Sequence, residues 1–168
     1  MKVRHTFVLA PEEEINEERR KKRMEFLGNI RKLISDPSVR EEVFDAIGNL
    51  EKNPSDEDAV GTVVGYADAS ALVQVSISAV HLPFFEVEDF EGSTELLAAF
   101  IAGNIQAQFT ENAFYSHYEE GVHRMLDAYE ILREQGKCAA HEQLDKWLAA
   151  KKAGTLVVPK AEQPKPVE

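Results

Sequence analysis

A glutamate and a histidine are spaced so that one helix could present both to a metal ion. Glu120 and His123 form an E-x-x-H pair, the i, i+3 arrangement that di-iron bundles repeat on two of their helices. Such a centre needs a second pair and two further inward carboxylates, and the sequence holds one pair. On a helical projection both side chains lie among other acids, opposite the apolar face. The pattern favours a solvated acidic face, so we predict no metal or cofactor, with Glu120 and His123 as the nearest candidates.

Two more histidines lie at the borders of apolar helix faces. His117 borders the face of a helix predicted over residues 111–134, and His141 borders that of a shorter helix at 139–151. If these helices pack antiparallel, the two imidazoles could meet in a metal site or a pH-sensitive contact. The alternative is that each histidine only marks the edge of an apolar stripe.

Two amides interrupt the most apolar segment of the chain. Asn104 and Gln108 lie in the predicted helix 94–109, which is hydrophobic nearly all round, as is typical of a central buried helix. A buried amide without a partner costs about 1–3 kcal/mol, so each must be satisfied by protein, water or ligand. Structural satisfaction is one reading, and a small-molecule pocket is the other. The predicted polar lining of that pocket is Asn104, Gln108, Tyr115, His117 and Tyr118.

The usual signatures of enzymes are missing from the sequence. It contains no glycine-rich phosphate loop, no G-x-S-x-G elbow and no H-E-x-x-H pair. The single cysteine, Cys138, has only Lys137 as a basic neighbour and reads as a small apolar residue. These features favour a non-enzymatic role.

The net charge of −11 limits the partners that the protein can bind. A negative field repels phosphates, so nucleic acid is disfavoured except through the basic run from Arg19 to Arg23. This run follows a series of glutamates, an order that also gives i, i+4 ion pairs on a solvated helix. No apolar stretch approaches the roughly 20 residues that span a bilayer. We expect a cytoplasmic protein with no membrane partner.

The elements that would position these residues are mainly helical. Amphipathic patterns predict five helices, near 12–35, 36–53, 94–109, 111–134 and 139–151. Residues 3–9, 60–66 and 72–80 are rich in β-branched residues, and the last of them alternates apolar and polar side chains. We therefore predict an α+β fold, mostly helical, with about five helices packed on a small antiparallel sheet of about three strands.

One globular domain is expected over residues 1–152, with 12–25 as a possible projecting charged helix segment and 153–168 as a disordered, proline-rich tail. The sequence holds more apolar side chains than one small sheet can cover. An interface is therefore predicted at Tyr129, Met125 and Trp147. The predicted function is that of a non-enzymatic interaction or regulatory protein that self-associates through acidic and aromatic helix faces. The alternative is a small-molecule- or metal-binding domain, with a small enzyme included, whose pocket lies between helix 94–109 and the sheet.

Overall fold

Helices dominate the part of the chain that the structure describes. The computed structural model describes Lys21, Met24, Glu25 and residues 37–160, and the first three of these are helical. The elements of residues 37–160 are α2 (Pro37–Lys52), α3 (Glu57–Ala69), the short 3-10 helix η1 (Pro83–Glu86), α4 (Ser93–Glu111), α5 (Tyr118–Glu134) and α6 (Glu142–Lys152). Most of the predicted helix 12–35, including its projecting part 12–25, lies outside the described residues, as does the predicted strand 3–9.

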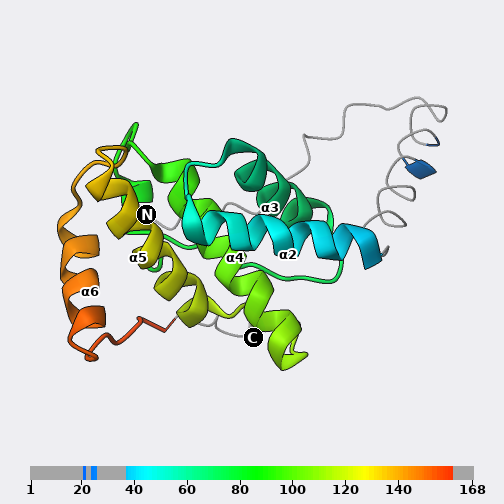
Figure 1. Cartoon of the computed structure of the whole chain (residues 1–168). Helices are drawn as coiled ribbons and strands as arrows, with labels where there is room; N and C mark the ends of the chain where they lie inside the picture. The colour runs from blue at the N-terminus through cyan, green and yellow to red at the C-terminus, as the bar shows by residue number, and fades with distance from the viewer. Residues whose placement is uncertain (1–20, 22–23, 26–36, 161–168) are drawn as a thin grey trace.

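Helix α4 runs through the middle of the molecule, with α2 and α3 on one side and α5 and α6 on the other (Figure 1). Its buried residues surround the helix axis, from Leu96 to Gln108, as the near-uniform apolar sequence predicts. One core cluster joins α4 to α5 and α6, and a second joins it to α2 and α3. The prediction of a central buried helix is therefore confirmed.

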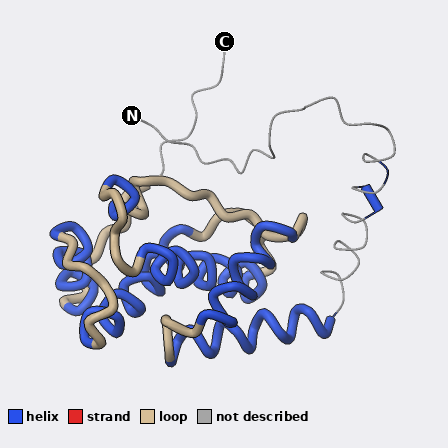
Figure 2. The backbone as a smooth tube through the Cα atoms, turned by 90° about the horizontal axis from the view of Figure 1, so that it is seen from above, coloured by secondary structure: helices blue, strands red, loops and turns tan. Residues whose placement is uncertain are grey.

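The prediction of a sheet is wrong within residues 37–160. Within residues 37–160 the chain forms helices and loops but no strand (Figure 2). Residues 60–66 belong to α3, whose buried Ala59, Val63 and Tyr66 follow a helical spacing. The N-cap Asp56 starts this helix, because its carboxylate accepts a hydrogen bond from the Ala59 amide at 3.0 Å. Capping and helical burial therefore outweigh the β-branched composition.

Residues 73–78 run as a segment without helix, residues 79–81 form a turn, and no strand lies beside them among the described residues. Val73, Val75 and Ile77 pack against the core, while Gln74 and Ser76 are exposed. The alternation of faces expected for a strand is thus present without a sheet. Since a β-sheet is absent here, the fold is helical rather than α+β.

The junction between α4 and α5 also differs from the prediction. α5 begins at Tyr118 rather than near residue 111, because α4 continues to Glu111 and ends in the left-handed Asn112 at φ 50°. The two helices then approach closely at glycines. A Cβ on Gly103 would lie 2.5 Å from the Glu120 carbonyl oxygen, and one on Gly121 would lie 2.4 Å from Asn104 Nδ2.

The described end of the chain, residues 153–160, packs on the body of the protein. Val158 is buried, and Leu156 packs against the cluster between α4, α5 and α6. His81, 1 % exposed, has its Nε2 atom 2.8 Å from the Pro159 carbonyl oxygen. The prediction of a disordered tail from residue 153 is therefore wrong for 153–160, while 161–168 lie outside the described residues.

Candidate functional site

The side chain of Gln108 holds the extended segment 72–78 against α4. Its Nε2 donates a hydrogen bond to the Gln74 carbonyl oxygen at 2.6 Å, and its Oε1 accepts one from the Gln74 amide at 3.0 Å. Both ends of this fully buried amide are therefore engaged with one main-chain unit. The bonds satisfy Gln108 structurally, which is the first of the two readings of the buried amides.

Asn104 is satisfied by a relay that reaches the same segment. Its Nδ2 donates to the Phe100 carbonyl oxygen at 3.0 Å, and its Oδ1 accepts from the Ser116 hydroxyl at 3.2 Å. Ser116 Oγ in turn accepts a hydrogen bond from the Ser76 amide at 3.1 Å. The loop before α5 thus joins a helix to a segment that pairs with no strand of residues 37–160.

The ligand pocket expected between helix 94–109 and a sheet loses its basis in this geometry. Asn104 and Gln108 bond to the protein itself, and the residues described contain no sheet to form the second wall. Tyr115 is 58 % exposed and stacks on His117, with ring centroids 4.5 Å apart. Tyr118 stacks on His81 at 4.6 Å. The five predicted lining residues therefore each have a contact within the protein itself.

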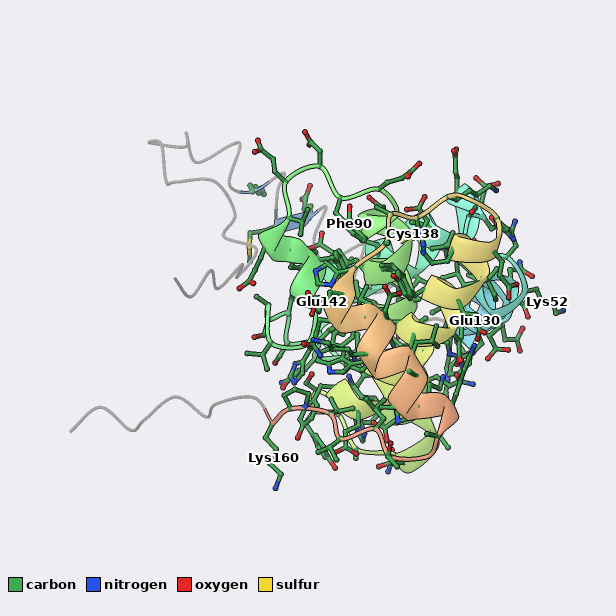
Figure 3. The ribbon with its side chains drawn as sticks, turned by 90° about the vertical axis from the view of Figure 1, so that its left-hand side faces the viewer. Lys52, Phe90, Glu130, Cys138, Glu142 and Lys160 are labelled. Atoms are coloured by element: carbon green, nitrogen blue, oxygen red, sulfur yellow. The ribbon has the colours of Figure 1, made fainter. Side chains whose placement is uncertain are left out.

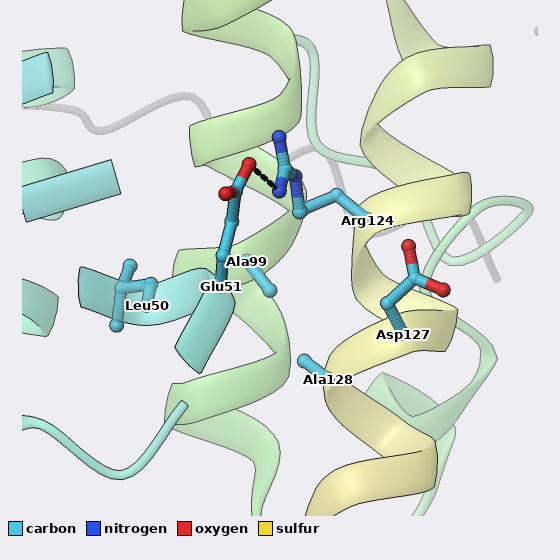
Figure 4. Close-up of a pocket in the computed structure, with 6 residues that line it drawn as sticks. All are labelled: Leu50, Glu51, Ala99, Arg124, Asp127 and Ala128. Carbon is cyan, nitrogen blue, oxygen red and sulfur yellow. Dashed lines mark hydrogen bonds and ion pairs between the residues drawn. The ribbon is translucent and has the colours of Figure 1, made fainter. Parts of the chain in front are cut away.

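A hollow of about 350 Å³ lies instead where α2, α4 and α5 meet (Figure 4). Its lining residues are Leu50, Glu51, Ala99, Arg124, Asp127 and Ala128. Arg124 of α5 reaches across to hydrogen-bond Glu51 of α2, and its second terminal nitrogen bonds Gln106 of α4. The arginine therefore connects three helices, and each of its terminal nitrogens has a protein acceptor.

The loop between α4 and α5 gathers a different polar group. His117, at the N-terminal cap position of α5, is only 6 % exposed. Its Nε2 lies 2.9 Å from the Ala113 carbonyl oxygen, and its Nδ1 lies 3.6 Å from Glu111 Oε2 and 3.8 Å from Glu120 Oε2. These three residues form a cluster in which a buried imidazole faces two half-exposed carboxylates.

Glu120 therefore pairs with His117 and not with His123. The imidazole of His123 is exposed, and only the main-chain carbonyl of that residue is engaged, by Lys151 Nζ at 2.8 Å. The predicted solvated position of His123 fits this arrangement. Glu120 and His117 have the i, i+3 spacing of neighbours on one helix, so the sequence carried a signal for this contact, whereas the E-x-x-H pattern points to Glu120 with His123 instead.

His117 and His141 do not come together as antiparallel packing of their helices would allow. His141 caps α6, where its Nδ1 accepts the Gln143 amide at 3.2 Å, and it lies edge-on to Phe90. His81 is the histidine most enclosed by aromatic rings, between Tyr118 and Phe100. Burial lowers the pKa of His81, a shift that its hydrogen bond to Pro159 opposes.

The predicted interface residues are in the core and cannot form a surface contact as they stand. Tyr129 and Met125 are fully buried, and Trp147 is 9 % exposed. The Tyr129 hydroxyl donates to Asp145 at 2.7 Å and accepts the His141 amide at 3.0 Å. Burial and the Asp145 bond raise the pKa of Tyr129 to about 12. The aromatic stripe of α5 therefore packs against α6 within one chain.

Part of the acidic face of α5 is also paired within the chain. Asp127 and Glu130 form ion pairs with Lys151 and Lys152 of α6, and Glu130 lies on the side of α5 that faces α6 (Figure 3). Such exposed pairs contribute only about 0–1 kcal/mol each. They nevertheless reduce the negative charge that this face offers to a partner.

Cys138 lies beside Phe90 at one end of α5 and α6 (Figure 3). It is a free thiol, 2 % exposed, and burial raises its pKa to about 11. A buried protonated thiol is a poor nucleophile, so the arrangement fits the apolar role expected of it.

Comparison of the chain with protein-family models, with curated proteins and with solved structures gives no match. None of the helices in the described ranges combines the length and the hydropathy needed to cross a membrane.

Proposed function

We propose that the protein is a non-enzymatic interaction protein that associates with a second copy of itself through residues 80–89. The observation that carries the proposal is a set of exposed apolar side chains on a firmly anchored segment. Val80, Phe85 and Val87 are 45, 38 and 45 % exposed. Phe85 and Val87 lie next to the exposed acids Glu86, Glu88 and Asp89.

The segment is held by buried residues on both sides of the exposed ones. Leu82 and Phe84 are fully buried, and Phe90 is 7 % exposed. Phe84 stacks on Phe90 with centroids 5.7 Å apart, and the exposed Phe85 packs edge-on to Phe84 at 5.0 Å. A surface that is already ordered loses less conformational entropy on binding.

A second copy supplies the charge complement that this surface needs. The segment is acidic, so two copies of it placed face to face would repel each other. The basic run from Arg19 to Arg23, in a part of the chain outside the described residues, is the opposite charge in the same sequence. The proposed contact therefore places the acidic and apolar segment of one copy against the basic run of the other, and symmetry gives two such contacts.

The cytoplasmic location belongs to the same proposal. The single cysteine is a free, buried thiol. A reducing compartment keeps thiols in this state.

Sedimentation velocity of the whole chain at tens of micromolar tests the association. We expect a dimer that weakens as salt is raised, because the contact is partly ionic. The double variant Phe85→Ser, Val87→Ser should shift the population toward monomer. Leu72→Ser, at a residue 49 % exposed but outside the segment, is the matched control and should leave the dimer intact. A monomeric unaltered protein at low salt would refute the proposal.

A further inference from the structure

We propose that Glu111, His117 and Glu120 bind a divalent transition-metal ion, and that Zn²⁺ suits their donor set best. Glu111 is the last residue of α4, His117 immediately precedes α5, and Glu120 lies in the first turn of α5. The three ligand atoms, one nitrogen and two carboxylate oxygens, lie within 4.8 Å of one another. This site is independent of the proposed self-association.

The first hydrogen bond of His117 fixes a proton on one of its two ring nitrogens. A carbonyl oxygen can only accept, so the 2.9 Å contact with Ala113 requires the proton to be on Nε2. In the neutral imidazole Nδ1 then carries no proton and has a free lone pair. Metal-binding histidines commonly donate their second N–H to a main-chain carbonyl in this way, which orients the ring and selects the ligating nitrogen.

Nδ1 of His117 lies near two carboxylates. Its distances of 3.6 and 3.8 Å from Glu111 and Glu120 exceed hydrogen-bond length. The ring is 6 % exposed, so water screens this contact poorly. A neutral ring therefore presents a lone pair to two anions, an arrangement that becomes favourable when a positive charge lies between them. That charge is either a second proton on the ring or a bound cation.

Two of the three distances between ligand atoms are close to those of a zinc site. Zinc bonds of about 2.0–2.2 Å in a tetrahedral site place ligand atoms roughly 3.4 Å apart. The observed distances of 3.6 and 3.8 Å are within a few tenths of this value. Both glutamate side chains are about half exposed, at 50 and 46 %, so they can rotate toward the ion. Their exposure also leaves the fourth position open to water.

The donor set and the local field select the type of ion. One imidazole with two carboxylates suits Zn²⁺ and similar transition metals, whereas Ca²⁺ and Mg²⁺ prefer oxygen ligands throughout. The C-terminal end of α4, where Glu111 lies, adds the partial negative charge of its free carbonyls. The N-terminus of α5 opposes this, and the two helix ends largely offset each other. The carboxylates therefore supply most of the attraction.

Zinc titration of the whole chain by isothermal calorimetry tests the proposal. We expect one Zn²⁺ per chain, and Glu111→Gln and Glu120→Gln should each weaken the affinity by about tenfold or more. Glu119→Gln and His123→Gln are matched controls, because both residues are exposed and lie outside the cluster. These controls should bind zinc as the unaltered protein does.

Two outcomes would overturn the site. The first is no zinc binding up to millimolar concentration. The second is one-to-one binding that survives Glu111→Gln and Glu120→Gln, which would place the ion elsewhere. The ¹⁵N resonances of the His117 ring distinguish the metal from a proton. Zinc at constant pH should shift Nδ1 in the unaltered protein, whereas a ring that responds to pH alone would show that the cluster binds only a proton.

Discussion

The side-chain amide of Gln108 offers Gln74 the same pair of hydrogen bonds that a neighbouring strand would offer. A strand supplies one N–H and one C=O to each residue that it pairs with, and the amide of a glutamine carries both groups at its tip. Ser116 repeats half of this arrangement at Ser76. Individual polar side chains thus satisfy main-chain N–H and C=O groups of a segment that pairs with no strand of residues 37–160.

The variant Gln108→Met removes these bonds while nearly keeping the buried volume. We expect the free energy of unfolding to fall by about 1–3 kcal/mol, because the N–H and C=O of residue 74 lose their partners in a partly buried setting. Denaturant titration measures the change. Gln74→Ala is the control, since residue 74 bonds through its main chain and its exposed side chain should contribute less than about 0.5 kcal/mol. Equal losses in the two variants would contradict this account.

At the scale of elements, the contact between α4 and α5 depends on Gly121. An added Cβ would lie 2.4 Å from Asn104 Nδ2 and 2.8 Å from two ring carbons of Phe100. Overpacking of this kind costs about 1–3 kcal/mol, while replacing a helical glycine by alanine returns about 1 kcal/mol of helix propensity. The two helices can therefore approach closely only if this position lacks a side chain.

We expect Gly121→Ala to lower the free energy of unfolding, by up to about 2 kcal/mol, because the clash exceeds the gain in propensity. Gly61→Ala in α3 is the control with the opposite sign. Nothing lies within 4 Å of a Cβ there, so this variant should gain up to about 1 kcal/mol. Thermal unfolding of both proteins decides the matter, and a stabilised Gly121→Ala variant would show that α4 and α5 can separate at little cost.

Helix periodicity predicted α2, α4 and α6 well, and it failed where local composition opposed the packing. Residues 60–66 lack charge and contain several β-branched residues, yet the preceding Asp56, Glu57 and Asp58 form a helix start. The burial of Ala59, Val63 and Tyr66 then follows the i, i+4, i+7 spacing of a helix. The helix start and the helical spacing are both visible in the sequence, and they determine the structure of this segment more than its β-branched composition does.

The polar residues were predictable in kind but not in their partners. The sequence shows that Asn104 and Gln108 are amides in an apolar helix and must be satisfied. Their partners lie 12 and 34 residues away, and no local pattern predicts contacts at such separations. The carboxylates near His117 are close in sequence, but Glu111 ends α4 and Glu120 lies in α5, and the sequence pattern did not predict the break between these helices.

On the scale of the whole molecule, residues 153–160 pack against the core and contact His81. Their contacts include the buried Val158, the packed Leu156 and the bond between Pro159 and His81, which are 78 residues apart. The prolines and charges of the whole segment 153–168 predict a free tail. Two apolar side chains and one carbonyl are enough to attach it.

Truncation after Gly154 should therefore destabilise the protein. Loss of the buried Val158 alone removes about 1.5–3 kcal/mol, which corresponds to a fall in Tm of at least about 3 °C for a chain of this size. Differential scanning calorimetry measures the change. Truncation after Lys160 keeps every contact of residues 155–160 and is the matched control. If both truncations lower Tm equally, these contacts are not the cause.

Residues 72–78 are held against α4 and the loop before α5 through their main chain, which leaves their exposed side chains open to substitution. The bonds that hold it come from Gln108 and Ser116 and end on the main chain of Gln74 and Ser76. The side chains at 72, 74 and 76 are exposed and take no part in these bonds, whereas Val73 is buried. Alternate positions can therefore carry foreign side chains without loss of the backbone path. The segment is a natural place to graft a short extended peptide epitope onto a helical scaffold.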